Sequence, residues 1–387
     1  MTSRLSRYVV IMACLSILAA VRVTHATGAD EQLTHQLQSK LDSLRTAGSI
    51  PGVTAAVAFP DGRMISVMSG FADTTSRLPM TSHTLLMQGS IGKTYVSAVA
   101  LQLVHEGKLD LDAKVEKYLG SYGWYARIPN AADITVRMLM NHTSGVMRYE
   151  FKDAFTKDLT AHPEKMWKPE ELVAYVLGDT ASFPAGTGWE YSDTNYILLG
   201  MILEKITGMK YYDLMRTRIL DRFGLKNTVP VEGPEIPGLA QGYAGEDNPF
   251  GGTSEMLRQG KFVINPQFEW TGGGVASTSA DLARWATIVY TGKAFDPTLM
   301  DQFLNGVPAR LGPNARYGLG VILRNSPWGP SYGHSGFFPG YLAEMMYFPE
   351  KGFSVVVQVN SSDFRNLKVR PGRILYEIAR LVAERAE

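Results

Sequence analysis

Strand-like patterns lie near both ends of the chain, and this feature most constrains the fold that the sequence can adopt. Apolar, β-branched runs occupy residues 53–59 and 63–68, and the turn signal Pro60-Asp61-Gly62 joins them. Four more strand-like runs come late in the chain, at residues 317–323, 332–338, 341–348 and 353–359. Between the two sets the pattern is mainly helical. One sheet built from both termini, with a helical region inserted, satisfies this order.

The helical patterns complete the predicted architecture. An amphipathic helix is expected over residues 30–47 and a final helix over 371–386. Residues 225–275 are rich in Gly, Pro and polar groups and are expected to form long surface loops. We therefore predict an α/β (α+β) fold in which helices flank an antiparallel sheet. An α/β domain would comprise residues 27–82 and 311–387, and a mostly helical domain residues 83–310. Helix caps are expected at Asp193 or Thr194, and at Ser279.

The N-terminus has the pattern of a secretory signal. Arg4 and Arg7 precede an apolar stretch over residues 9–21, and Thr24-His25-Ala26 forms a small-residue cleavage site. We expect residues 1–26 to be removed, with export to the periplasm or the medium and no stable membrane anchor afterwards.

Composition excludes several classes of function. The formal net charge is +1 with no long basic block, which gives no support for nucleic-acid binding. Cys14 is the only cysteine and lies within the signal, so the mature chain would have no disulfide and no thiolate chemistry. The seven histidines are scattered without metal-ligand spacing. No metal or cofactor is predicted, and the sequence does not indicate an oligomeric state.

The first candidate for chemistry is Ser90, three residues before Lys93 at the start of an apolar helical run over residues 94–104. That spacing places the hydroxyl and the amine one turn apart. Burial lowers the pKa of a lysine and makes it a usable base for a neighbouring serine. The motif alone is weak, because roughly one Ser-x-x-Lys is expected by chance in a chain of this length. Ser90 as a plain helix cap is the alternative.

Two further stretches supply the other groups that such a serine needs. Tyr191 and Asp193 precede a helical run, and the Tyr191 phenol can shuttle protons beside a cation. His334-Ser335-Gly336-Phe337 lies on a predicted strand, where Gly336 allows close approach of a substrate backbone. The N–H groups of Phe337 and Ser90 are candidates for an oxyanion hole. As alternatives, Tyr191 and His334 are structural residues and Asp193 is a helix cap.

The order Ser-x-x-Lys, Tyr-x-(Asn/Asp), (Lys/His)-x-Gly resembles the penicillin-binding and class C β-lactamase superfamily of active-site serine hydrolases. Supporting phrases span most of the mature chain: residues 107–112, 141–145, 191–200 and 272–282. The resemblance implies an acyl-enzyme on Ser90, proton transfer by Lys93 and Tyr191, and a substrate backbone held by the strand of His334.

Two positions depart from the β-lactamase pattern. His334 stands where β-lactamases usually have lysine, although His-x-Gly is familiar in D-alanyl-D-alanine carboxypeptidases and D-amino-acid peptidases of the superfamily. Asp193 stands where asparagine is usual. A carboxylate beside Lys93 favours the ammonium and repels an anionic substrate. We therefore expect Tyr191 to carry more of the proton transfer than Lys93, and we expect the preferred substrate not to be a penicillin.

The sequence thus predicts an exported serine hydrolase acting on a small-molecule or peptide substrate. Its reaction would be amide hydrolysis in peptides containing D-residues, with weak β-lactamase activity. The alternatives are a carboxylesterase on the same fold, a β-lactamase proper, and a penicillin-binding sensor that is acylated without turnover.

Overall fold

The computed structural model of the chain describes residues 28–246, 248 and 254–385. Cys14 and the predicted signal, residues 1–26, lie outside these residues. Among the helices of the described part, none combines the length and the apolar character needed to cross a membrane.

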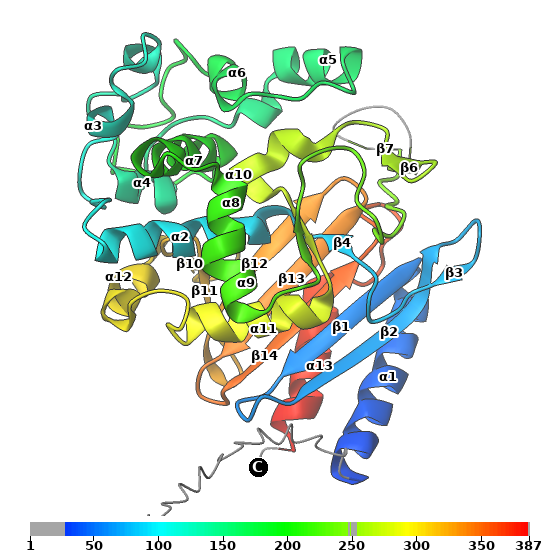
Figure 1. The fold of residues 1–387 in the computed structure, drawn as a ribbon. Coiled ribbons are helices and arrows are strands. Elements are labelled where there is room, and N and C mark those ends of the chain that lie inside the picture. Colours follow the sequence, from blue (N-terminus) through cyan, green and yellow to red (C-terminus); the bar gives the residue numbers. More distant parts are fainter. Residues whose placement is uncertain (1–27, 247, 249–253, 386–387) are drawn as a thin grey trace, which may run out of the picture.

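A nine-stranded antiparallel sheet is built from the two ends of the chain (Figure 1). Three strands come from the N-terminal part and six from the C-terminal part, and β1 pairs with β14 where the two parts meet. The strands are, in spatial order, β3 (Leu78–Pro79), β2 (Met64–Asp73), β1 (Gly52–Ala58), β14 (Phe353–Val359), β13 (Tyr341–Phe348), β12 (Gly329–Phe338), β11 (Ile322–Ser326), β10 (Arg316–Tyr317) and β9 (Val307–Pro308).

Helices cover both faces of this sheet. α1 (Gly28–Gly48) and α13 (Pro371–Ala383) pack on one face, and α11 (Ser279–Tyr290) packs on the other. Strand β1 is buried at every position, because Val53, Ala55 and Val57 face the α1–α13 layer while Ala56 and Ala58 face the second core. This explains why residues 53–59 form an apolar run without polar alternation.

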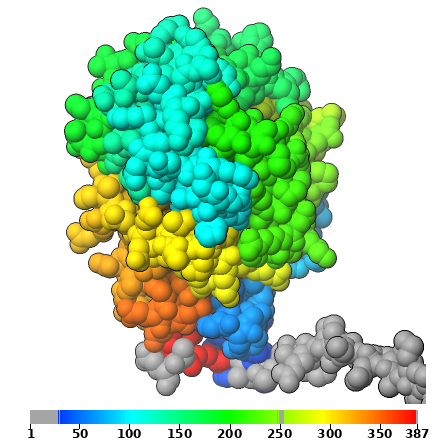
Figure 2. Space-filling model, turned by 60° about the vertical axis from the view of Figure 1, so that its left-hand side comes forward, coloured from blue at the N-terminus to red at the C-terminus, as the bar shows by residue number. Residues whose placement is uncertain are grey.

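The middle of the chain forms a mostly helical region at one end of the molecule, and the terminal segments gather at the other end (Figure 2). Its elements are α2 (Lys93–His105), α3 (Glu116–Leu119), α4 (Val136–Met140), α5 (Asp153–Ala161), α6 (Pro169–Ala174), α7 (Asp193–Thr207), α8 (Tyr211–Met215), α9 (Asp221–Phe223), α10 (Trp270–Gly273) and α12 (Met300–Leu304). Short strands β4 (Leu86–Met87), β8 (Val275–Ser277) and β5 (Thr228–Pro230) form a small sheet, and β6 (Leu257–Arg258) pairs with β7 (Lys261–Phe262).

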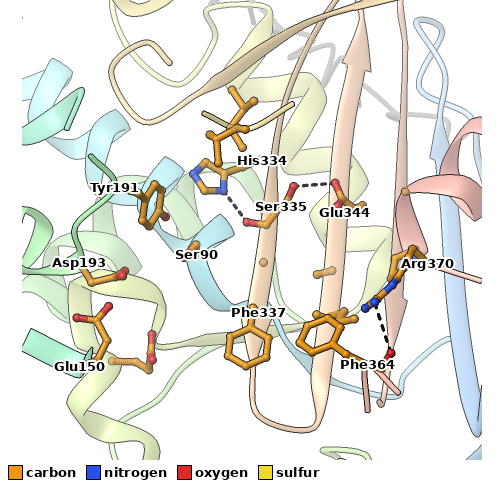
Figure 3. Close-up of a pocket in the computed structure, with 18 of the residues that line it drawn as sticks. Ser90, Glu150, Tyr191, Asp193, His334, Ser335, Phe337, Glu344, Phe364 and Arg370 are labelled. Carbon is orange, nitrogen blue, oxygen red and sulfur yellow. Dashed lines mark hydrogen bonds between the residues drawn. The ribbon is translucent and has the colours of Figure 1, made fainter. Parts of the chain in front are cut away.

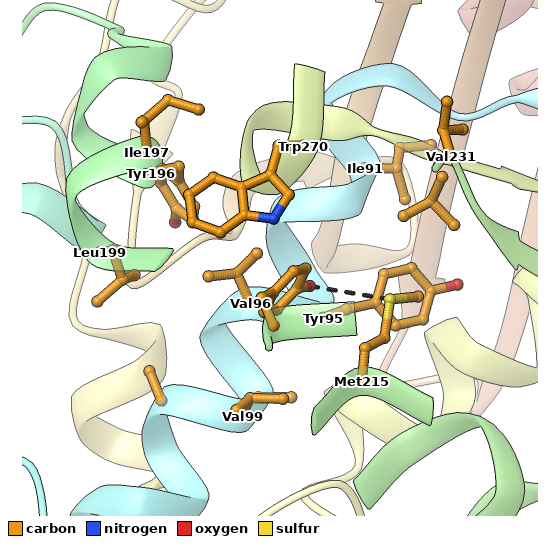
Figure 4. Packing of buried hydrophobic residues seen from close by; sticks show 14 of the residues in the cluster. Ile91, Tyr95, Val96, Val99, Tyr196, Ile197, Leu199, Met215, Val231 and Trp270 are labelled. Carbon is orange, nitrogen blue, oxygen red and sulfur yellow. Dashed lines mark hydrogen bonds between the residues drawn. The ribbon is translucent and has the colours of Figure 1, made fainter. Parts of the chain in front are cut away.

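Helix α2 lies at the centre of this region, surrounded by side chains from α7, α8 and α10 (Figure 4). Every residue from Lys93 to Leu103 is buried. A helix that is apolar on all sides is a core helix, and its first residue is carried into the interior with the rest. The burial of Lys93 is therefore a consequence of the sequence over residues 94–104.

The predicted fold class is confirmed by the sheet, its flanking helices and the helical insertion. The division into two domains stays a prediction, and α11 packs on the sheet although it belongs to the segment 83–310. The surface-loop prediction for residues 225–275 is wrong near its end, because Trp270–Gly273 forms the buried helix α10.

Both predicted helix caps, Asp193 or Thr194 for α7 and Ser279 for α11, are wrong. The N-cap of α7 is Ser192, and the Asp193 side chain binds cations in place of capping the helix. Thr278 caps α11 by accepting a hydrogen bond from the Asp281 N–H, while the Ser279 hydroxyl bonds to Thr54.

Candidate active site

Ser90 lies in a short 3-10 turn, η1 (Gly89–Gly92), that leads directly into α2. Its hydroxyl lines a cavity of about 560 Å³ between the sheet and the helical region. The Nζ of Lys93 donates a hydrogen bond to Ser90 Oγ at 3.1 Å. The two residues of the Ser-x-x-Lys motif are therefore in direct contact, with the hydroxyl facing the cavity and the amine behind it.

Lys93 is fully buried and is held by three acceptors. Besides Ser90 Oγ, its Nζ contacts a carboxylate oxygen of Asp193 and the carbonyl oxygen of Gly272 in α10. Burial acts to lower the pKa of Lys93, but the Asp193 carboxylate outweighs it and the pKa is raised above its ordinary value. Lys93 is thus an ammonium near neutral pH, as the sequence argument from Asp193 anticipated.

Asp193 joins Lys93 to a second, half-buried cation, Arg148. One carboxylate oxygen of Asp193 contacts Lys93 and the other accepts a hydrogen bond from Arg148 Nη2 at 2.7 Å. Burial alone would raise the pKa of Asp193, yet Lys93 and Arg148 hold it well below the usual range. Both oxygens of this carboxylate are therefore occupied by protein cations.

Glu150 and Glu269 add two carboxyl groups to the same wall of the cavity. Arg148 donates to one oxygen of Glu150, and the other oxygen, Oε2, is buried without a partner among the described residues. Burial, reinforced by the Asp193 charge, raises the pKa of Glu150 and raises that of Glu269 to about 8. Glu269 makes no hydrogen bond or salt bridge to the described part of the chain. The wall thus carries two cations and three carboxyl groups.

Tyr191 stands over Lys93 with its hydroxyl buried and without a hydrogen-bond partner in the described structure. The Lys93 Nζ lies 4.9 Å from the centre of the Tyr191 ring. Burial raises the pKa of Tyr191, and the nearby Lys93 ammonium opposes this only in part, so the residue is a neutral phenol near pH 7. The His142 ring packs at 4.2 Å from the Tyr191 ring and fixes its position from behind.

His334 lies on β12 opposite Tyr191 (Figure 3). Its Nδ1 contacts the Ser335 carbonyl oxygen at 2.7 Å, and its Nε2 contacts the Tyr317 hydroxyl at 2.9 Å. Burial, together with the Lys93 charge, lowers the pKa of His334 to about 3. The imidazole is therefore neutral at physiological pH and brings no positive charge to the place where the β-lactamase pattern has lysine.

The segment His334–Phe338 forms an open strand edge beside Ser90. β11 pairs with β12 only between Gly329 and Gly333, so this edge has no strand on that side among those the structure describes. A Cβ on Gly336 would collide with the Gln88 carbonyl oxygen, and one on Gly89 would lie 2.6 Å from the Phe337 nitrogen. Only glycine allows this approach, which brings the Phe337 N–H beside the turn that carries Ser90.

All seven residues predicted from sequence meet at this one place. Ser90, Tyr191, Asp193, His334, Gly336 and Phe337 line the cavity, and Lys93 contacts it through Ser90. Their individual catalytic roles stay predictions. Sequence reasoning missed Arg148, Glu150, Glu269, Phe364 and Arg370, which also line it. In the described residues, no group of three or more His, Cys, Asp or Glu side chains is arranged to hold a metal ion.

A Ser-x-x-Lys pair with its lysine buried, a facing tyrosine and an open strand edge, set between an antiparallel sheet and a helical region, define an active-site serine hydrolase. Comparison with known proteins agrees: the Beta-lactamase family model matches residues 37–376. The chain belongs to this family. The predicted superfamily and the predicted class of enzyme, a serine hydrolase, are confirmed at that level.

Similar proteins of known name include two groups. Penicillin-binding protein 4* of Bacillus subtilis is 26% identical over 76% of this chain and 64% of its own length. Penicillin-binding protein 4 of Amycolatopsis lactamdurans is 28% identical over 84% of each. D-aminopeptidase of Brucella anthropi is 24% identical over 87% of this chain and 62% of its own length. The chain thus spans less than two thirds of the Bacillus and Brucella relatives.

Among solved structures, D-amino acid amidase from Ochrobactrum anthropi SV3, complexed with D-phenylalanine, superposes with a TM-score of 0.78 at 25% identity. The match covers 92% of this chain and 99% of that one. A D-stereospecific amidohydrolase from Streptomyces has a TM-score of 0.74 at 26% identity, over 86% of this chain and 97% of that one.

Proposed function

We propose that this protein is an amidohydrolase that cleaves the amide bond following a residue with a free amino group, through an acyl-enzyme on Ser90. The observation that carries the proposal is the number of carboxyl groups in the cavity wall: Asp193, Glu150 and Glu269 stand beside only two cations, so two of the three lack a full cationic partner. The names of the relatives, D-aminopeptidase, D-amino acid amidase and D-stereospecific amidohydrolase, support a D-residue as the acyl part.

A substrate ammonium completes this wall. Asp193 is saturated by Lys93 and Arg148, whereas Glu150 Oε2 and the Glu269 carboxyl group have no hydrogen-bond partner among the residues that the structure describes. Burial and the Asp193 charge raise the pKa values of both groups, so ionising them is costly even beside Arg148. An ammonium bound between them would favour the ionised carboxylates and form charge-assisted hydrogen bonds with them. Neutral His334 supplies no positive charge for the carboxylate of a penicillin, which the lysine of the β-lactamase pattern would supply.

The residues of the site can carry out acylation, and each proton that moves has a donor and an acceptor. Ser90 Oγ attacks the carbonyl carbon while the phenol of Tyr191 accepts the Ser90 proton and passes its own to the leaving nitrogen, so that no free phenolate is needed. The Lys93 ammonium, 3.1 Å from Ser90 Oγ, stabilises the negative charge that develops there. The N–H groups of Ser90 and Phe337 would hold the carbonyl oxygen. The amine then leaves, and water cleaves the ester by the reverse proton route, releasing the acid and restoring Ser90.

Two parts of the proposal rest on the sequence. Export follows from the signal pattern in residues 1–26. Weak β-lactamase activity and an esterase activity follow from the indifference of a serine nucleophile to the type of acyl bond. A simple ester has no ammonium group for the carboxyl groups of the cavity wall to bind, so we rank the carboxylesterase second.

A panel of chromogenic substrates tests the proposal. We expect hydrolysis of D-alanine p-nitroanilide, and a kcat/KM about 10- to 100-fold lower once its amine is acetylated, since hydrogen bonds to the charged group are lost. The L-enantiomer, p-nitrophenyl butyrate and a chromogenic cephalosporin complete the panel, with Ser90→Ala as the inactive control. Equal kcat/KM for the free and the acetylated amine would refute amine recognition, and a preference for the butyrate ester would favour the esterase.

A further inference from the structure

The cavity does not end at Ser90. Opposite the wall of Asp193 and Glu150, it continues across β12 and β13 toward the loop that precedes α13, where Phe337, Phe364 and Arg370 line it (Figure 3). If the substrate ammonium occupies the acidic wall, the group leaving from the carbonyl points into this second half. A volume of about 560 Å³ exceeds what a single amino-acid amide needs and lies in the range of sites for larger ligands.

Two exposed aromatic rings form the floor of this half. Phe337 is 37% exposed and Phe364 is 51% exposed, and their rings stack at 5.9 Å with an angle of 21°. Of the six large apolar side chains that are exposed in the described part of the chain, three line this one cavity: Phe151, Phe337 and Phe364. Scattered exposed apolar residues need no explanation, but a concentration inside a catalytic cavity indicates a binding surface for an apolar group.

Arg370 adds a cation at the far side of the rings. Its guanidinium lies 4.5 Å from the Phe364 ring centre and donates to the Phe364 carbonyl oxygen at 3.5 Å. Among the residues that the structure describes, no carboxylate lies within ion-pair distance of it. A guanidinium facing a cavity without a protein anion is suited to a ligand carboxylate, which it can bind through two hydrogen bonds.

We propose that the half of the cavity lined by Phe337, Phe364 and Arg370 binds the residue after the scissile bond, an inference that rests on the proposed function. The rings of Phe337 and Phe364 take its apolar or aromatic side chain, and Arg370 takes its C-terminal carboxylate. The preferred substrates are then short peptides, above all dipeptides with an N-terminal D-residue and an apolar C-terminal residue, in preference to simple amides.

Four substrates that share one acyl residue test this proposal: D-alaninamide, D-Ala-Gly, D-Ala-Phe and D-Ala-Phe amide. For the wild type we expect kcat/KM to be about tenfold higher for D-Ala-Phe than for D-Ala-Gly, from aromatic stacking. Masking the carboxylate as the amide should cost about tenfold, from loss of the charge-assisted contact.

The variants separate the two contacts. Phe364→Ala should bring the ratio of kcat/KM for D-Ala-Phe over D-Ala-Gly close to one, and Phe364→Tyr should keep it. Arg370→Gln should remove the distinction between the free carboxylate and the amide while keeping the preference for phenylalanine. Leu78→Ala, which truncates an exposed apolar residue of β3 outside the cavity, is the matched control and should leave both ratios unchanged.

The outcomes distinguish this proposal from the one on which it rests. Hydrolysis of D-alaninamide with equal kcat/KM for D-Ala-Gly and D-Ala-Phe would overturn the subsite alone. A Phe364→Ala variant that keeps the wild-type preference would overturn it as well. Failure to hydrolyse any of the four substrates would instead overturn the proposed function.

Discussion

Replacing Asp193 by asparagine removes the carboxylate that neutralises Lys93, a residue with no solvent exposure. Breaking a buried ion pair by removing one partner costs about 3–5 kcal/mol when the other charge remains. Lys93 can escape this cost by losing its proton, but from an ordinary lysine pKa of about 10.4 that costs about 4.6 kcal/mol at pH 7. Both routes give the same range, and we expect the free energy of unfolding at pH 7 to fall by about 3–5 kcal/mol.

The pH dependence identifies the route. Without the carboxylate, burial lowers the pKa of Lys93, so the folded variant lacks a proton that its unfolded chain binds until about pH 10. Stability of the variant should then rise by about 1.4 kcal/mol per pH unit between pH 7 and 9. In the wild type the pKa of Lys93 is raised, so its ammonium stays intact over that interval and gives no such rise.

Urea unfolding followed by tryptophan fluorescence at pH 7 and pH 9 measures both quantities. The matched control is Asp112→Asn, which breaks the exposed two-bond pair with Arg137 and should cost less than about 1 kcal/mol. The reasoning is refuted if Asp193→Asn costs no more than this control. An equal deficit at pH 7 and pH 9 would show that Lys93 keeps its proton without Asp193.

Three further predictions concern activity. The pKa of about 8 for Glu269 means that its carboxylate is lost as the pH falls below 8, so kcat/KM on a free-amine substrate should decline there, and Glu269→Gln should remove this decline from the pH profile. Tyr191→Phe should lower kcat by about 10²–10⁴-fold in a p-nitroanilide assay, and a loss of less than threefold would exclude the proton relay. Gly336→Ala should push β12 away from the Gln88 carbonyl oxygen, which should lower the free energy of unfolding by about 1–3 kcal/mol and abolish activity. Thermal unfolding measures the first effect. Gly123→Ala, where a Cβ has open space, is the control and should change neither stability nor activity.

The fold could be predicted from the sequence because the strand-like and the helical patterns are separated along the chain. Strand-like runs at both ends and helical runs between them leave few possible folds. The β1–β14 pairing joins the N-terminal and C-terminal strands into one sheet. The ends of the helices were harder to predict from the sequence. Ser279 has the chemistry of a cap, yet its hydroxyl bonds to Thr54 on the sheet, a contact that only tertiary packing creates.

Ser90 and Lys93 were predictable from their spacing, and Tyr191 and His334 from the order of the motifs that resembles the superfamily. Ser90 and Lys93 are one turn apart on a helix, and Gly336 marks a close approach of strands and turns. Arg148 and Glu269 could not be found in this way, since Arg148 reaches the site from a loop and Glu269 from the end of a separate 3-10 helix, η5 (Pro266–Glu269). The available signals were weak: Arg148 follows the turn His142–Gly145, and Glu269 precedes the glycine run at residues 272–274.

The central claim is that Ser90 carries the acyl group during turnover. Rapid-quench mass spectrometry of the intact protein with D-alanine p-nitrophenyl ester, followed by peptide mapping, tests it most directly. The account predicts a transient gain of one alanyl group on the peptide containing Ser90, absent from the Ser90→Ala variant. An adduct on another residue, or turnover by Ser90→Ala at the wild-type rate, would contradict it.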